Sequence, residues 1–266
     1  MVEIVPAARH SAAMFSRLFG RRREVSEPPA APAGMRFYAV GDIHGRIDLL
    51  TLLHAKMRED AAAAAPDLRK IAVYLGDYVD RGDASRAVID HLIGEPLPGF
   101  ERVFLKGNHE AIMLDFLDDP LVGRGWLFNG GDATLYSYGV GFESAANREE
   151  RLGRMRDGLE AALPPAHRAF LDSLALYHVA GDYLFVHAGI RPGRALDEQT
   201  EEDLLWIREE FLGSGDHHGH CVVHGHTISS TPDVRNNRIG IDTGAYFSGR
   251  LTCLVLEGRS QRLIQT

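Results

Sequence analysis

Short apolar runs that end abruptly in glycine and polar residues recur along this chain of 266 residues. Their β-branched, aromatic and aliphatic residues are typical of buried β-strands. Segments of helical periodicity over 47–65 and 85–93 separate the first three runs, and this alternation is typical of βαβ units. The sequence therefore predicts an α/β fold with buried strands. The runs lie at 37–40, 71–75, 103–106, 183–186 and 221–223.

The residues that directly follow these five runs could carry out chemistry. Because the carboxyl ends of the strands in an open α/β sheet meet at one edge, we expect the five loops to converge there. They bring carboxylate, imidazole and amide groups but no thiolate, a ligand set that suits manganese, iron or zinc and argues against an iron–sulfur cluster. The candidate ligands are Asp42, His44, Asp77, Asn108, His187 and His226.

Six such side chains exceed what one ion needs. Two divalent ions about 3.5–4 Å apart that share one carboxylate would use all of them and would activate a bridging water for attack on phosphorus. A single histidine after a strand is more often a structural residue. Five independent clusters with complementary ligand types nevertheless favour a metal centre.

The composition excludes several other classes of protein. A net charge of −8 and a pI near 5.9 argue against a chain that coats nucleic acid or an anionic membrane. Two cysteines are too few for a disulfide framework and indicate a reducing compartment. No apolar run reaches the length of a membrane span, so we expect a cytoplasmic protein with no integral membrane segment and no nucleic-acid partner. The oligomeric state stays open.

The chain divides into two parts by composition. Residues 1–34 contain a short apolar patch, three consecutive arginines and a Pro- and Ala-rich stretch, which is typical of a flexible tail and linker. A docking helix at a membrane surface is the alternative. Residues 35–266 form the predicted catalytic domain, with a helical insertion at about 120–180. We expect this insertion to lie over the metal site and set substrate access, and plain packing of an added helical layer is the alternative.

Five motifs resemble the calcineurin-like metallophosphoesterases and, within them, the phosphoprotein phosphatase branch, the metal-dependent serine/threonine phosphatases that include bacterial and phage members. The resemblance covers roughly residues 35–257. It implies a two-sheet β-sandwich flanked by helices, the α/β/β/α fold of that family, with a two-metal site at one rim. The motifs are Gly-Asp-Ile-His-Gly at 41–45, Gly-Asp-Tyr-Val-Asp-Arg-Gly at 76–82, Gly-Asn-His-Glu at 107–110, Val-His-Ala-Gly at 186–189 and Gly-His-Thr at 225–227.

The resemblance implies a division of the six ligands between two ions. Manganese is the first expectation for these ions, and iron, zinc, magnesium and nickel are alternatives. Many metallophosphoesterases end the ligand set with Gly-His-x-His, but Ile228 stands where the second histidine would be. The phosphoprotein phosphatase branch also lacks this second histidine. Asp42 and His44 would hold the first ion, Asp77 would bridge both, and Asn108, His187 and His226 would hold the second.

The resemblance also implies catalytic roles for residues beside the metals. His109 would protonate the leaving alkoxide as general acid, and Asp80 would orient its imidazole. Arg81 and Arg208, together with Asn108, would bind the phosphate oxygens. The assignment of Arg208 depends on its place in the segment 205–208 and on its distance past His187. A solvated helix arginine is the alternative, with Arg191 or Arg250 in its role.

These motifs predict a metal-dependent phosphoesterase that hydrolyses phosphomonoesters by direct attack of a metal-bridging hydroxide. Phosphoserine and phosphothreonine proteins are the first expected substrates, and small phosphoesters are also possible. The alternative is a diadenosine tetraphosphatase acting on dinucleoside polyphosphates. Asp80, Glu110 and the Gly-His-Thr motif favour the protein phosphatase. A non-catalytic scaffold of the same fold is a third hypothesis, and the complete ligand set argues against it.

The other histidines have no role implied by the motifs. His224 lies two residues before His226, and we expect it to support the site without binding a metal. His54, His91, His167 and His178 lie in helical or linking segments with no suitable partner nearby in the sequence, so we expect them to be background residues.

Overall fold

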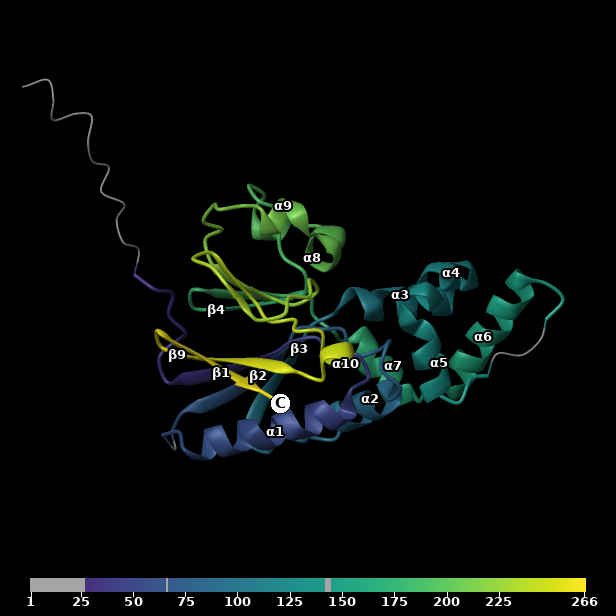
Figure 1. Ribbon diagram of the computed structural model, residues 1–266, viewed down its shortest axis with the longest axis horizontal. Helices are drawn as coiled ribbons and strands as arrows, with labels where there is room; N and C mark the ends of the chain where they lie inside the picture. The colour runs from purple at the N-terminus through teal and green to yellow at the C-terminus, as the bar shows by residue number, and fades with distance from the viewer. Residues whose placement is uncertain (1–26, 66, 142–144) are drawn as a thin grey trace, which may run out of the picture.

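Two five-stranded β-sheets pack face to face in the computed structural model, which describes residues 27–65, 67–141 and 145–266. Helices cover the outer face of each sheet (Figure 1). This order of layers confirms the predicted α/β/β/α fold. It also corrects the expectation of one open sheet, because the five polar loops leave the strands of two different sheets. The strand orders are β10-β9-β1-β2-β3 and β4-β5-β6-β8-β7.

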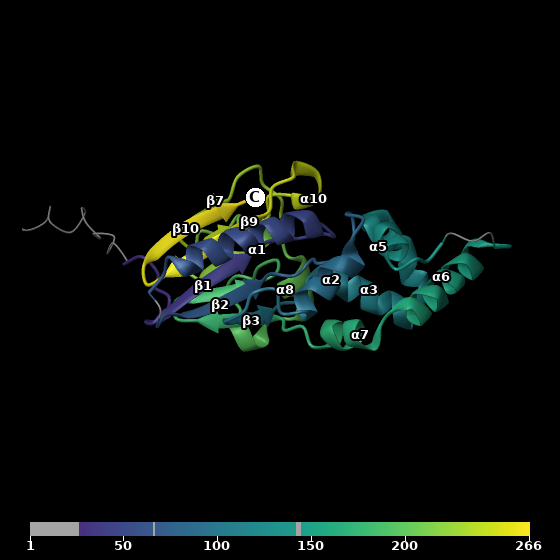
Figure 2. The ribbon, with the colours of Figure 1, turned by 90° about the horizontal axis from the view of Figure 1, so that it is seen from below.

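The first sheet contains the three predicted N-terminal strands in parallel. These are β1 (Met35–Val40), β2 (Arg69–Tyr74) and β3 (Phe100–Phe104). Two further strands, β9 (Thr252–Glu257) and β10 (Ser260–Gln265), extend the sheet beyond β1 in antiparallel pairing. α1 (Ile47–Ala62) and α2 (Ser85–Ile93) cover its outer side (Figure 2). α2 has the predicted bounds, whereas α1 ends before residue 65.

The second sheet contains the other two predicted strands, β5 (Tyr183–Val186) and β6 (Cys221–His224), in parallel. β8 (Arg238–Gly240) runs parallel to β6, while β4 (Tyr177–Ala180) and β7 (Asp233–Val234) form antiparallel edges. α8 (Glu201–Trp206) and α9 (Glu209–Leu212) lie on its outer side, and α10 (Ala245–Ser248) precedes β9.

Side chains alternate between two hydrophobic layers along the central strands. Phe37 of β1 points between the sheets and stacks on Phe185 of β5, with ring centroids 5.8 Å apart. Tyr38 and Val40 point the other way, into the cluster beneath the helices. Because both faces of these strands are buried, their sequences are apolar without an alternating polar face.

A helical insertion projects from one end of the sandwich, at the right of Figure 1. It follows α3 (Asn108–Asp118) and ends before β4, so its helices stop short of residue 180. Its elements are the 3-10 turn η1 (Pro120–Val122), α4 (Gly123–Trp126), the π-helical turn η2 (Leu127–Gly131), α5 (Asp132–Ser137), α6 (Arg148–Ala162) and α7 (Pro165–Asp172).

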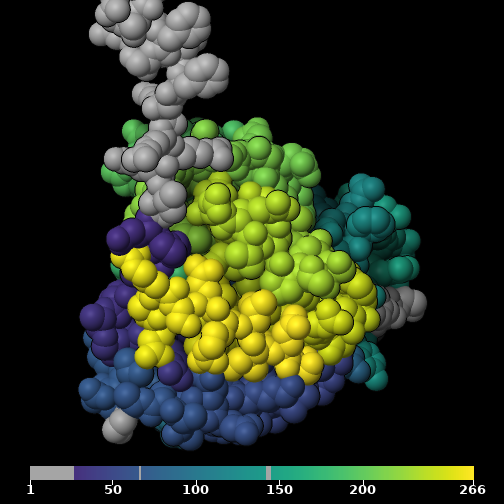
Figure 3. Space-filling view, turned by 60° about the vertical axis from the view of Figure 1, so that its left-hand side comes forward, coloured from purple at the N-terminus to yellow at the C-terminus, as the bar shows by residue number. Residues whose placement is uncertain are grey.

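The end of the predicted linker contacts both sheets. The Ala31 amide donates to the Gly258 carbonyl at 2.7 Å, and the Ala30 amide donates to Asp182 Oδ2 at 2.9 Å. Figure 3 shows these purple residues against the yellow C-terminal strands. Residues 1–26, which make up most of the predicted tail, lie outside the described residues. In the described parts of the chain, no helix is both long and apolar enough to cross a membrane.

Candidate metal centre

Backbone amides join the loops after four strands, β1, β2, β5 and β6, at one end of the sandwich. The His44 amide donates to the Asp77 carbonyl at 2.8 Å, which joins the loops after β1 and β2. The Gly225 amide donates to the His187 carbonyl at 2.8 Å, which joins the loops after β6 and β5. The His226 amide crosses between the sheets to Asp42 Oδ2 at 3.0 Å. The predicted convergence of the polar loops is therefore present, although it spans two sheets.

The carboxylate of Asp77 lies between two histidine rings. His44 Nε2 is 3.4 Å from Oδ2, and His187 Nε2 is 3.5 Å from Oδ1. His44 Nδ1 lies 2.8 Å from the Val79 carbonyl and His187 Nδ1 lies 2.8 Å from the Leu75 carbonyl. A carbonyl oxygen only accepts, so both Nδ1 atoms carry the proton and both Nε2 atoms are lone-pair acceptors. Unprotonated nitrogens this close to a carboxylate are suited to binding a cation together with it.

The amide oxygen of Asn108 adds a further acceptor on the His187 side. Asn108 Oδ1 lies 2.9 Å from His187 Nε2 and 2.9 Å from His226 Nδ1. Among the described residues, two groups of side chains have ligand atoms within 4.8 Å of one another: His44, Asp77 and His109, and Asp77, His187 and His226. Both groups contain Asp77. The types of ligand atom and the shared carboxylate of Asp77 fit two divalent ions.

Protonation states in this cluster also suit metal ligands. Burial lowers the pKa of His44 to about 3 and that of His226 to about 2, so both rings are neutral at physiological pH. Burial alone would raise the pKa of Asp77, but the imidazoles of His187, His109 and His44 hold it well below its usual value. Neutral imidazoles around an ionised carboxylate are the forms that bind cations.

Asp42 lies in the same buried region beside a carboxylate that has no role implied by the motifs, Asp242. Burial raises the pKa of Asp42 well above its usual value, and the charges of Asp242 and Asp77 add to the effect. Burial likewise raises the pKa of Asp242 to about 6. Asp42 Oδ1 and Asp242 Oδ2 are buried without a hydrogen-bond partner among the described residues. Three carboxylates in one buried region require compensating positive charge.

Strained backbone is concentrated at the predicted site residues. Among the described residues, six that are not glycine have positive φ, and five of them are site residues: His44 (46°), Asp77 (53°), Asp80 (72°), Arg81 (68°) and His226 (61°). A side-chain-bearing residue in this left-handed region costs about 1–2 kcal/mol. The surrounding fold therefore holds these residues in unfavourable conformations, a feature of functional sites.

His109 and Asp80 form a buried pair next to the two ligand groups. His109 Nδ1 lies 2.6 Å from Asp80 Oδ2. Two residues of the helical insertion hold the carboxylate: Trp126 Nε1 donates to Oδ2 at 2.8 Å, and Thr134 Oγ1 donates to Oδ1 at 2.6 Å. Burial alone would lower the pKa of His109, but the charges of Asp77 and Asp80 raise it. The insertion thus contacts the site through Asp80.

The two predicted phosphate-binding arginines lie on opposite sides of the cluster. Arg81 Nη1 donates to His44 Nε2 at 2.7 Å, and its guanidinium lies 4.9 Å from the ring centroid of Tyr246. Arg208 is exposed and lies between α8 and α9, and its Nη1 donates to the His226 carbonyl at 3.3 Å. Arg191 instead pairs with Asp203 and Glu210.

Glu110 fastens the loop that bears Asp77 to the start of α3. Its carboxylate accepts the amides of Asp77 (2.8 Å), Tyr78 (2.7 Å), Val79 (3.2 Å) and Gly107 (2.9 Å). Burial and the charge of Asp77 raise the pKa of Glu110 to about 7. All four neighbours are donors, however, so this geometry fits the anion. A Cβ atom on Gly107 would overlap Asp77 Oδ1, which explains the glycine in Gly-Asn-His-Glu.

Residues 35–249 match the sequence pattern of the family described as calcineurin-like phosphoesterase. The chain belongs to this family. A bis(5'-nucleosyl)-tetraphosphatase PrpE from Bacillus thuringiensis is 28% identical over 245 residues, covering 83% of this chain and 90% of that protein. Serine/threonine-protein phosphatase 2 from Salmonella typhimurium is 28% identical over 224 residues, covering 81% of this chain and 90% of that protein.

Solved structures support the phosphoesterase fold. A crystal structure provisionally named a diadenosine tetraphosphatase superposes with a TM-score of 0.56 at 20% identity, covering 89% of this chain and 98% of the other. A cold-active protein tyrosine phosphatase superposes with a TM-score of 0.51 at 18% identity, covering 89% of this chain and 78% of the other. At these identities, the likeness concerns the fold alone.

Sequence reasoning missed several residues around this phosphoesterase site. Asp242 follows the apolar segment 239–241 and precedes Thr243 and Gly244, so it repeats the pattern of an apolar run ending in a polar residue and could have been found that way. Nothing local indicated that Trp126 and Thr134 would bind Asp80. Nor did the sequence show which residues the background histidines would contact.

Those histidines have partners that are distant in the sequence. His54 Nδ1 lies 3.0 Å from His91 Nε2, and Tyr74 Oη lies 2.9 Å from His54 Nε2. His167 lies 2.8 Å from both the Tyr138 hydroxyl and Asp90. Tertiary packing therefore supplies partners that the neighbouring sequence does not. His178 lies in β4, so the prediction that it belongs to a helical or linking segment is wrong.

Proposed function

We propose that this phosphoesterase hydrolyses phosphate esters with two divalent metal ions that share Asp77. Asp42 and His44 would complete the first site, and Asn108, His187 and His226 the second. The observation that most directly supports this proposal is that two unprotonated imidazole nitrogens, His44 Nε2 and His187 Nε2, lie 3.4 Å and 3.5 Å from the two oxygens of the buried Asp77 carboxylate. Manganese is our first candidate for both ions. Bound divalent ions would supply a water of lowered pKa as nucleophile and would neutralise charge on the phosphate.

The side chains around the ions have complementary tasks in this mechanism. His109, whose pKa the charges of Asp77 and Asp80 raise, would donate its proton to the oxygen of the leaving group. Asp80 keeps the ring oriented and charged. Arg81 and Arg208 bind phosphate oxygens from opposite sides, and Asn108 contributes from the start of α3. Arg81 must leave His44 Nε2 when a metal ion binds there, which frees its guanidinium for the substrate.

Dinucleoside polyphosphates are the substrates that we propose first. Similarity to PrpE tetraphosphatases over most of both chains supports this choice. It reverses the order of the two substrate classes that we inferred from Asp80, Glu110 and the Gly-His-Thr motif. Phosphoserine and phosphothreonine proteins are the second candidate, because the similarity to serine/threonine-protein phosphatase 2 is of the same level.

Turnover of diadenosine tetraphosphate and of a phosphoserine peptide, measured with manganese and after treatment with a chelator, tests the proposal. We expect metal-dependent hydrolysis, with a higher kcat/KM for the dinucleotide. Asp77→Asn should weaken the binding of both ions in a calorimetric titration, because both sites lose charge. Asp118→Asn, on the exposed end of α3, is the matched control. Preserved binding of two ions by the Asp77→Asn protein would contradict the shared ligand.

A further inference from the structure

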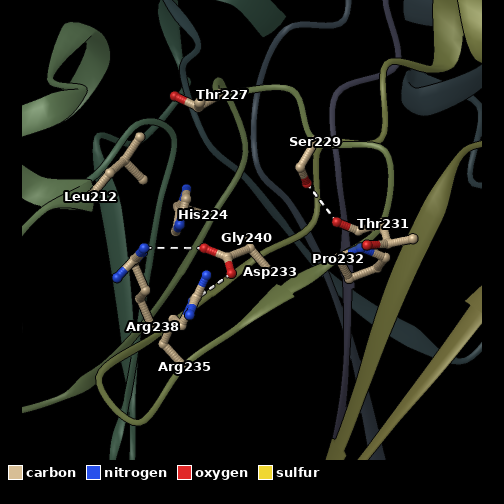
Figure 4. A pocket seen from close by; sticks show the side chains of 10 residues that line it. All are labelled: Leu212, His224, Thr227, Ser229, Thr231, Pro232, Asp233, Arg235, Arg238 and Gly240. Atoms are coloured by element: carbon tan, nitrogen blue, oxygen red, sulfur yellow. Dashed lines mark hydrogen bonds and ion pairs between the residues drawn. The ribbon is translucent and has the colours of Figure 1, made fainter.

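A pocket of about 330 Å³ opens on the outer side of the second sheet, beside the metal centre. Its walls come from the end of β6, from β7 and β8, from α9 and from the turn after Gly-His-Thr, as Figure 4 shows. No motif assigns a role to this pocket. Ligand pockets range from about 300 to 1,000 Å³, so its size suits one nucleotide-sized group and not a folded partner.

Thr227 connects this pocket to the proposed phosphate site. Its side chain lines the pocket, and its hydroxyl accepts a hydrogen bond from Arg208 Nη1 at 3.1 Å. The same arginine donates to the carbonyl of His226, a proposed metal ligand. A substrate whose phosphate contacts Arg208 can therefore extend past Thr227 into the pocket.

Two buried polar atoms of pocket-lining residues have no hydrogen-bond partner among the described residues, His224 Nε2 and Arg238 Nε. His224 is 2% exposed and Arg238 is 8% exposed. His224 Nδ1 lies 3.1 Å from the Gly225 carbonyl and therefore carries the proton, so Nε2 is an acceptor. A buried acceptor and a buried donor left unpaired are costly, and a ligand with both hydroxyl groups and oxygen acceptors satisfies them.

The charges of the pocket favour an anion. Asp233 pairs with Arg235 at 2.6 Å and with Arg238 at 3.1 Å, which leaves one positive charge in excess. The dashed contacts in Figure 4 show this arrangement. Hydroxyl groups of Thr227 and Ser229 complete a polar lining.

We propose that this pocket binds the nucleotide portion of the substrate that lies beyond the attacked phosphorus. Ribose hydroxyls meet His224 Nε2, and phosphate oxygens meet the guanidinium groups of Arg238 and Arg235. The inference rests on the proposed function and deepens it, because it explains how the same metal centre would select a dinucleoside polyphosphate over a short phosphate ester.

Two variants alter the pocket without touching the metal centre. Arg235→Ala removes an exposed cation. Gly240→Ala adds a Cβ atom 3.1 Å from His224 Nε2 and so crowds its lone pair. We expect Arg235→Ala to lower the kcat/KM for diadenosine tetraphosphate about tenfold relative to that for p-nitrophenyl phosphate, since one charge-assisted hydrogen bond is lost, and Gly240→Ala to lower it severalfold, since one neutral hydrogen bond is lost; both should act mainly by raising KM. Arg168→Ala on α7 is the matched control for Arg235→Ala. Gly153→Ala on α6 is the matched control for Gly240→Ala, because its new methyl group meets no atom within 4 Å.

The two substrates separate failure of this inference from failure of the proposed function. If the protein hydrolyses neither substrate with metal present, the phosphoesterase proposal fails, and the pocket proposal with it. If it hydrolyses p-nitrophenyl phosphate normally and the ratio of the two kcat/KM values is unchanged in both variants, the pocket proposal alone is overturned. A loss confined to phosphopeptide turnover would overturn it as well, because the pocket would then bind peptide.

Discussion

Replacing Glu110 by glutamine tests whether one buried carboxylate organises the loops that position Asp77 and Asn108. The two oxygens of Glu110 accept four backbone amides, which come from residues 77–79 and from Gly107. Glutamine preserves the shape of the side chain. Its NH₂ group, however, faces two amide donors in either orientation, so two of the four hydrogen bonds are lost.

The expected loss of stability follows from those two amides. Each buried N–H group left without an acceptor costs about 1–3 kcal/mol, which gives about 2–6 kcal/mol in total. In a domain of this size, each 1 kcal/mol lowers the melting temperature by about 2–4 °C. We therefore expect Glu110→Gln to lower the melting temperature by on the order of 10 °C.

Thermal unfolding followed by circular dichroism in the presence of a chelator measures this effect without a contribution from metal binding. Glu101→Gln is the matched control, because Glu101 is exposed and pairs with Arg69 at 2.8 Å. Such a surface pair contributes at most about 1 kcal/mol. A decrease for Glu110→Gln no larger than that for Glu101→Gln would refute the reasoning, since it would mean that water or loop movement satisfies the four amides.

Two further variants test the acid and the first metal site. Asp80→Asn removes a charge that raises the pKa of His109, and a general acid works only below its pKa. The alkaline limb of kcat/KM for p-nitrophenyl phosphate should therefore move to lower pH; an unmoved limb would remove His109 from this role. Gly225→Ala should weaken the binding of one ion out of two in a calorimetric titration, because its Cβ would overlap Asp42 Oδ1. The control is Gly153→Ala, whose methyl group meets open space. If the Gly225→Ala protein binds both ions as this control does, Asp42 is not a ligand.

Several parts of the fold could be predicted from local sequence because their causes are local. An apolar run followed by a glycine-containing polar turn indicates the end of a strand, and this pattern located β1, β2, β5 and β6. The strand β9 is also an apolar run, which ends at Glu257 and is followed by Gly258 and Arg259, so the same pattern fits it. The types of the six candidate ligands could be read directly, because ligand chemistry belongs to each side chain.

The tertiary structure alone decided how these pieces meet. Strand order depends on which distant strands pair, so β9 could separate β1 from β10 without any local sign. Trp126 and Thr134 reach Asp80 from 46 and 54 residues away, through the packing of the helical insertion. The pocket around His224 likewise exists only where β8, α9 and a turn come together. By itself the sequence determined which chemistry the chain could perform, because side-chain chemistry is local; tertiary packing decided the distances, burial and charges that could make the chemistry possible.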